Sequence, residues 1–167
     1  RTVVKPVSLK GRGLHSGVDV EVTINPAPEN HGYQFKRTDL EGSPIIRALA
    51  EYVKITDRST TIVDKEASIT TVDNALMEIN GPEVPIIDGS AKPFVAAILS
   101  AGIAEQEAER IYYQIREKIE YRDEAKGIEI IGYPDNDFCV DVHIDFNSKV
   151  LGHQYASLKN ISEFEAG

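Results

Sequence analysis

A loop over residues 80–90 constrains the fold of this chain more than any other stretch, because two prolines and two glycines restrict its backbone. Proline fixes φ, and glycine permits turns that other residues resist. Residues 74–79 before the loop alternate apolar and polar side chains as a half-buried strand does. Residues 92–101 after it have the pattern of an amphipathic helix. We therefore expect a rigid connection between a strand and a helix.

The helix over 92–101 has recognisable ends and one apolar face. Ser90 is expected to be its N-cap, Pro93 lies in the first turn, and Gly102 stands where a C-cap is expected. Its apolar residues recur at helical spacing, and they are Phe94, Ala97, Ile98 and Ala101. Such a face is suited to packing on a sheet.

Short alternating or β-branched runs predict strands along the first part of the chain. The candidate strands are 2–9, 18–24, 33–37, 45–50, 52–55, 57–63 and 67–72. Gly11–Gly17 has the look of a dinucleotide-binding loop, but its third glycine is one position late and a strand follows it instead of a helix. We therefore expect a hairpin that connects two antiparallel strands.

A second series of strand patterns begins after the charged segment 105–109, which is expected to be a linker. The predicted strands are 111–115, 118–121, 127–133 and 138–146, with turn residues at 123–127 and 134–137. A helix is predicted to begin at Ser162. Little in this part of the sequence can cover the sheet, so we expect an open apolar face and an incomplete unit.

Composition excludes several function classes. The net charge of −9 disfavours a surface for nucleic acid or anionic membrane, because phosphate binding depends on clustered Lys and Arg. No apolar run approaches the length of a membrane span, and no secretory signal is recognisable at the N-terminus. The single cysteine, Cys139, cannot form an internal disulfide and is expected in the core. These features favour a reducing cytoplasm.

Few residues suggest a reaction by themselves. The four histidines include no pair at the spacing of metal ligands. His143 and Asp145 share a strand face, where hydrogen bonds to neighbouring residues are favoured over a zinc site. His15, on the tight turn, suits either contact with a ligand or exposure to solvent. Arg58–Thr61 offers a cation and three hydroxyls that could hold a phosphate, although an edge strand with surface hydroxyls is favoured.

Several motifs nevertheless recur in this order in one family. They are Gly13–Gly17, Pro26–Pro28, Arg37–Leu40, Thr71–Val72, Gly81–Ala91 and Pro93–Val95, followed by Asp145–Asn147 and Gln154–Ser157. In these motifs the whole chain resembles the UDP-3-O-acyl-N-acetylglucosamine deacetylases, the zinc amidases of bacterial lipid A synthesis. The stretch Lys159–Ser162 is similar to forms from Bacteroidetes, some of which are fused to a β-hydroxyacyl carrier-protein dehydratase.

The resemblance implies an α+β fold of two similar domains, each with a mostly antiparallel sheet layered against helices. Residues 1–104 are then expected to be the first domain, and 105–167 the incomplete start of the second. The implied reaction removes the N-acetyl group of UDP-3-O-acyl-N-acetylglucosamine at a site between the domains. A zinc ion held by two histidines and an aspartate activates water there, and a glutamate acts as general base.

Two segments of the family pattern have no counterpart in this sequence. The Glu-His pair and the helix of about three turns that follow Thr-Val in the family are missing where Val72 meets Asp73. The second-domain His-Lys-x-x-Asp segment would lie beyond Gly167. No residue is therefore assigned as catalytic or as a metal ligand. Zinc is expected in the full-length family member only, and this chain alone is predicted to be inactive.

Two explanations of the missing segment stay open. Either it was excised, or it exists in the protein and is absent from this sequence. The second explanation is favoured. By resemblance, Arg58 and Ser59 border the substrate cleft, and His15 belongs to a turn that faces the same region. The implied partners are the UDP-sugar substrate and a dehydratase fused downstream. The alternative is a non-catalytic binding or scaffold module that kept the fold and lost the site.

Overall fold

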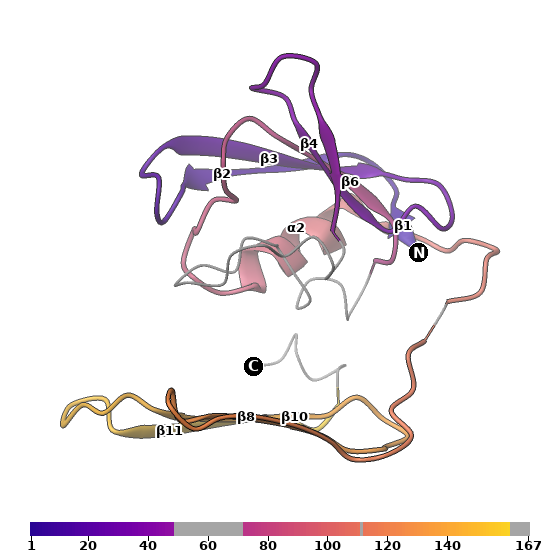
Figure 1. Ribbon diagram of the computed structural model, residues 1–167. Helices are drawn as coiled ribbons and strands as arrows, with labels where there is room; N and C mark the ends of the chain where they lie inside the picture. The colour runs from indigo at the N-terminus through magenta and orange to yellow at the C-terminus, as the bar shows by residue number, and fades with distance from the viewer. Residues whose placement is uncertain (49–71, 111, 161–167) are drawn as a thin grey trace. The chain divides into compact units, whose positions relative to one another are not determined.

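The computed structural model describes residues 1–48, 72–110 and 112–160, and the chain divides into two units, Arg1–Glu109 and Arg110–Gly167 (Figure 1). Several predictions lie outside the described residues: the strands 52–55 and 57–63, most of 67–72, and the helix from Ser162. No helix within the described ranges is long and apolar enough to cross a membrane.

The first unit contains a five-stranded sheet in the order β2-β3-β6-β4-β5. The strands are β2 (Val7–Arg12), β3 (Asp19–Pro26), β4 (Tyr33–Arg37), β5 (Ile45–Arg47) and β6 (Ala75–Ile79). Neighbouring strands are antiparallel except β4 and β6, which run parallel. The predicted hairpin between the first two long strands is confirmed, and the predicted strand 33–37 matches β4 at both ends.

The predicted strand 2–9 is wrong as one element. The structure divides it into β1 (Thr2–Val3), which pairs with β7 (Ile103–Ala104), and β2. Pro6 lies between them and has no N–H to donate, so a continuous ladder cannot form there. The short strand β7 was not predicted, because two residues give no recognisable alternation.

The helix α2 (Lys92–Ala101) has the predicted bounds and lies against one face of the sheet (Figure 1). Its C-cap is Gly102 at φ 76°, as predicted. The predicted N-cap is wrong by one residue, because Ala91 occupies that position and has helical dihedral angles. Ser90 still contributes, since its Oγ accepts a hydrogen bond from the Lys92 N–H at 3.3 Å.

The core of the first unit is formed between this sheet face and α2. Its buried apolar residues are Val3, Ile24, Val72, Ala75, Ile98 and Ala101. Burial of one Val or Ile side chain contributes about 1.5–3 kcal/mol, so this cluster supplies much of the driving force for folding. The predicted α+β class, with mostly antiparallel pairing, is confirmed.

The second unit consists of two hairpins. One pairs β8 (Ile119–Asp123) with β9 (Ile128–Gly132), and the other pairs β10 (Val140–Asp145) with β11 (His153–Leu158). The predicted strands 118–121, 127–133 and 138–146 are therefore confirmed. Residues 112–115 of the predicted strand 111–115 form no strand. β11 was not predicted.

One face of the β8–β9 hairpin is apolar and open. Ile119, Tyr121, Ile128 and Ile130 share it, and each is more than 40% exposed. This confirms the predicted open apolar face.

The prediction for Cys139 is wrong, since its thiol is exposed and donates to the Lys159 carbonyl at 3.0 Å. No described residue of this unit is buried, so nothing here forms a core that could enclose that cysteine.

Candidate functional site at the turn between β2 and β3

The turn Gly13–Gly17 closes the β2–β3 hairpin. The Gly13 N–H donates to the Val18 carbonyl at 2.9 Å, and the Gly17 N–H donates to the Gly13 carbonyl at 3.1 Å. Gly17 has φ 65°, a left-handed conformation that glycine adopts without strain. His15 lies at the tip, where it is exposed and its imidazole makes no hydrogen bond to the described residues.

A carboxylate from the Asn80–Ser90 loop binds this turn. Glu83 Oε1 accepts hydrogen bonds from the Ser16 N–H at 2.7 Å, the Ser16 hydroxyl at 2.6 Å and the His15 N–H at 3.0 Å. The hydroxyl and then the N–H of Ser16 lower the pKa of Glu83 below its usual value, because they stabilise the charged form. The turn therefore holds an ionised carboxylate at neutral pH.

Two glycines allow the loop to approach the hairpin closely. A Cβ at Gly13 would lie 2.1 Å from Glu83 Oε1, and a Cβ at Gly81 would lie 2.2 Å from Val20 Cγ1. Either distance is far below a normal contact, so a side chain at these positions would force the loop away. The glycines are therefore needed for the loop to pack against the hairpin, in addition to the predicted rigid connection between the strand and α2.

Further hydrogen bonds join the loop to backbone groups of the hairpin. The Ile86 N–H donates to the Arg12 carbonyl at 3.0 Å. Asn80 Oδ1 accepts from the Glu21 N–H at 2.7 Å, and its own N–H donates to the Glu21 carbonyl at 3.3 Å. The loop is therefore hydrogen-bonded to both strands of the hairpin, through Arg12 of β2 and Glu21 of β3. Glu83 lies between the two loop residues that make these contacts.

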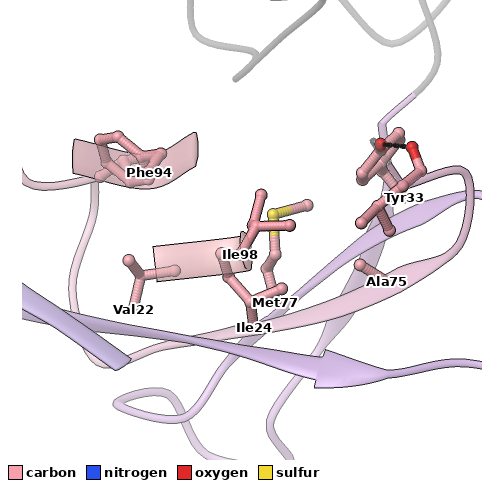
Figure 2. Close-up of a pocket in the computed structure, with 9 residues that line it drawn as sticks. Val22, Ile24, Tyr33, Ala75, Met77, Phe94 and Ile98 are labelled. Carbon is pink, nitrogen blue, oxygen red and sulfur yellow. Dashed lines mark hydrogen bonds between the residues drawn. The ribbon is translucent and has the colours of Figure 1, made fainter. Parts of the chain in front are cut away.

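An apolar pocket lies between the sheet and α2, with Val22, Ile24, Met77, Phe94 and Ile98 on its walls (Figure 2). The Tyr33 hydroxyl, at its margin, donates to the Val72 carbonyl. A small-molecule site normally adds a few convergent polar groups to orient its ligand. Because the described residues on its walls are apolar, the pocket has the character of core surface beside Val72 and not of a ligand site.

The second unit places His143 and Asp145 on one face of β10, but each contacts another residue. The His143 ring lies 4.5 Å from the Tyr155 ring, and the Tyr155 hydroxyl donates to Asp141 at 2.8 Å. Asp145 accepts from the Asn147 N–H at 2.8 Å. The prediction of a half-buried pair hydrogen-bonded to its neighbours holds only in part, because Asp145 accepts a hydrogen bond whereas His143 makes a ring contact, and both side chains are exposed.

The zinc ion implied by the resemblance does not fit the residues that the structure describes. Nowhere in 1–48, 72–110 and 112–160 do three His, Cys, Asp or Glu side chains form a group that could hold a metal. No catalytic step can be assigned to a metal on these residues.

Sequence reasoning singled out His15 as a substrate residue, which stays a prediction, and did not consider Glu83, whose carboxylate binds the same turn. The two lie 68 positions apart, and only the strand order brings them together. A signal was present, since Gly13 and Glu83 both belong to motifs that carry the resemblance, and the loop that contains Glu83 is its most specific part. The other predicted substrate residues, Arg58 and Ser59, lie outside the described residues and stay predictions.

Comparison with known proteins gives a consistent result. The family model for LpxC, UDP-3-O-acyl N-acetylglycosamine deacetylase, matches residues 1–166. The "Bifunctional enzyme LpxC/FabZ" of Porphyromonas gingivalis is 45% identical over 99% of this chain, and that of Bacteroides thetaiotaomicron is 41% identical over 99%. The UDP-3-O-acyl-N-acetylglucosamine deacetylase of Myxococcus xanthus is 42% identical over 92% of the chain.

The chain spans 38% of the length of the two bifunctional relatives and 52% of the Myxococcus protein. The alignment with the Porphyromonas enzyme extends over 177 positions, whereas the chain has 167 residues, so at least ten positions lack a residue here. The family model nevertheless covers almost every residue. On this match, the chain belongs to the LpxC family of UDP-3-O-acyl-N-acetylglucosamine deacetylases.

Proposed function

We propose that this chain is the N-terminal portion of a zinc-dependent amidohydrolase. The enzyme removes the N-acetyl group of UDP-3-O-acyl-N-acetylglucosamine in lipid A biosynthesis and works in the cytoplasm. The single observation that carries the proposal is the family match over residues 1–166. The two relatives named as bifunctional LpxC/FabZ enzymes support a dehydratase fused downstream in the complete protein.

In this proposal the zinc ligands and the general base belong to segments that are absent from the sequence. One segment belongs between Val72 and Asp73, and the other after Gly167. The alignment positions without a residue here support a missing internal segment. So does the apolar pocket beside Val72, because a missing core helix would leave apolar sheet surface uncovered. The 167-residue chain alone is then inactive.

His15, Arg58 and Ser59 form the substrate side of the proposed site. The exposed position of His15 on a turn with a fixed backbone supports its role, since the imidazole is accessible to a ligand. The cation of Arg58 and the hydroxyl of Ser59 suit the diphosphate of a UDP-sugar.

Acetate release from UDP-3-O-acyl-N-acetylglucosamine tests the proposal, with the product of the complete gene compared with the 167-residue chain. We expect the complete product to release acetate at a rate proportional to enzyme, and the 167-residue chain to release none above buffer. Activity of the short chain would show that its own residues form the site, and an inactive complete product would contradict the proposed reaction.

The second candidate is a non-catalytic binding or scaffold module. It is favoured by one observation, that the described residues offer no group of metal ligands. The gene sequence separates the two candidates. Codons for a segment with Glu-His between Val72 and Asp73 support the enzyme, whereas adjacent codons for these two residues and a stop after Gly167 support the scaffold.

A further inference from the structure

We propose that Glu83 is a positioning residue for substrate binding, because its carboxylate fixes the Gly13–Gly17 turn and thereby sets where His15 meets the substrate. The inference rests on the proposed function, which places His15 beside the UDP-sugar. It adds a residue that neither the resemblance nor the family match assigns to the site.

The contacts of Glu83 surround the attachment point of the His15 side chain. One oxygen, Oε1, accepts from the N–H groups of His15 and of Ser16, at 3.0 and 2.7 Å. The second oxygen lies 3.3 Å from the His15 nitrogen. Because the two N–H groups flank the His15 Cα, the carboxylate restrains the backbone on both sides of it.

The turn binds this carboxylate as a protein site binds an anion. Two successive N–H groups and a hydroxyl converge on one oxygen, as in the backbone concavities that bind phosphate or carboxylate. The Ser16 hydroxyl in turn accepts from the Val18 N–H at 3.2 Å, so the backbone two residues further on is restrained as well. Hydrogen bonds to an ionised acceptor are about twice as strong as neutral ones.

The turn also fits the carboxylate sterically. A Cβ at Gly13 would overlap Glu83 Oε1 at 2.1 Å and the Ser16 Oγ at 2.5 Å. Gly13 itself is buried although the three residues at the tip are exposed. A chance surface contact would not require an empty position directly beneath the carboxylate, so the close fit supports a specific role.

We expect the role to be mainly local, with only a small contribution to the stability of the fold. Six register pairs from Val7–Ile24 to Arg12–Asp19 hold the hairpin without Glu83. His15 and Ser16 are exposed and bury little apolar surface. Loss of the carboxylate should therefore loosen the turn and leave the sheet and its core in place.

The test measures binding of UDP-3-O-acyl-N-acetylglucosamine by calorimetry, with the complete gene product stripped of metal so that no turnover occurs. We expect Glu83→Ala and Gly13→Ala each to raise Kd about tenfold, since each leaves the turn without its acceptor. Glu83→Gln keeps one oxygen acceptor and should raise Kd about threefold. Asp88→Asn, on the same loop but bound to Ser90, is the matched control and should leave Kd unchanged.

Two further readouts separate positioning from folding. Hydrogen exchange of a peptide that spans residues 9–20 should be faster in Glu83→Ala, while the melting temperature stays within about 3 °C of the parent. The double variant Gly13→Ala/Glu83→Ala should bind no worse than Gly13→Ala alone, because the overlap with the carboxylate is gone. Unchanged exchange in this peptide would overturn the inference.

His15→Ala distinguishes failure of this inference from failure of the proposed function. If His15→Ala weakens binding and Glu83→Ala does not, the positioning role is wrong and the proposed substrate site stands. If the parent protein binds no substrate, or His15→Ala binds as the parent does, the proposed site is wrong and the inference falls with it. Weaker binding in His15→Ala and in Glu83→Ala, with no further loss in the double variant His15→Ala/Glu83→Ala, supports both the proposed site and the positioning role.

Discussion

The Asn74 side-chain amide donates a hydrogen bond to Gln106 Oε1 at 2.8 Å, and this contact joins the start of β6 to the segment after β7. Asn74 is buried, and its Oδ1 accepts from the Gly32 N–H at 2.8 Å. The Gln106 amide donates to the Ala27 carbonyl at 2.9 Å. The N–H groups of Glu107 and Ala108 donate to Glu29 Oε1, so residues 106–108 are hydrogen-bonded to the rest of the first unit, although the sequence predicts a linker there.

Asn74→Ala should lower the free energy of unfolding by about 1–3 kcal/mol, because it leaves the half-buried Gly32 N–H without its acceptor. Gln106→Ala should cost about 1–2 kcal/mol, and the double variant less than the sum, since the two residues share one hydrogen bond. Urea denaturation measures all three. Gln114→Ala is the control, because Gln114 is exposed. Strict additivity of the two losses would show that the contact contributes nothing.

Gly81→Ala should destabilise the first unit by about 1–3 kcal/mol, because the new Cβ would overlap Val20, which is only 3% exposed. Val20→Ala removes the overlapping methyl groups, so Gly81→Ala should cost less in that background. Thermal denaturation of the four proteins gives the coupling. Equal costs in both backgrounds would mean that the loop moves away from β3 freely.

Gly89 is needed for its backbone conformation and not for space. It has φ 82°, and a Cβ there would meet nothing within 4 Å. Gly89→Ala should therefore cost about 1–2 kcal/mol from left-handed strain alone, and Gly89→Asn less. Melting temperatures measure both. An unchanged melting temperature in Gly89→Ala would argue against a required turn before α2.

Acid should weaken the first unit through carboxylates whose pKa is lowered by hydrogen bonds. The pKa of Glu83 is lowered mainly by Ser16, and that of Glu78 mainly by Lys36, both from an ordinary value of 4.5. Since the unfolded chain then binds more protons, these groups stabilise the fold above about pH 4.5. This stabilisation is lost as the pH falls through the folded-state pKa.

The comparison of the parent protein with Glu83→Gln isolates one of these groups. Denaturation between pH 3 and pH 7 should show a shallower acid loss of stability in the variant. Identical slopes would mean that Glu83 titrates alike in the folded and unfolded chain, which would contradict its three hydrogen bonds in the turn.

The elements that sequence reasoning located are those whose signals are local. The hairpin follows from glycines next to alternating residues, and α2 from apolar residues at helical spacing that end at Gly102. The contact of Glu83 with Ser16 depends instead on strand order over 67 positions, which no local pattern contains. Cys139 was misplaced because an apolar neighbourhood in sequence does not bury a strand that lacks a covering layer.

The candidate site could be predicted only in part, because some of its contacts join residues far apart in sequence and other parts of the family pattern are absent here. His15 could be proposed because its motif is present in the sequence, whereas the contact of Glu83 with the same turn appears only in three dimensions. The zinc ligands implied by the resemblance belong to segments with no counterpart in this sequence. Their absence was recognisable at the Val72–Asp73 junction, where the family pattern breaks.

Zinc content per chain decides whether the metal ligands lie outside these residues, with the 167-residue chain and the complete gene product purified in parallel and analysed by mass spectrometry. We predict one zinc ion per chain in the complete product and none above background in the 167-residue chain. Stoichiometric zinc in the 167-residue chain would contradict this prediction, because the ligands would then lie among these residues. A complete product without zinc would contradict the proposed deacetylase itself.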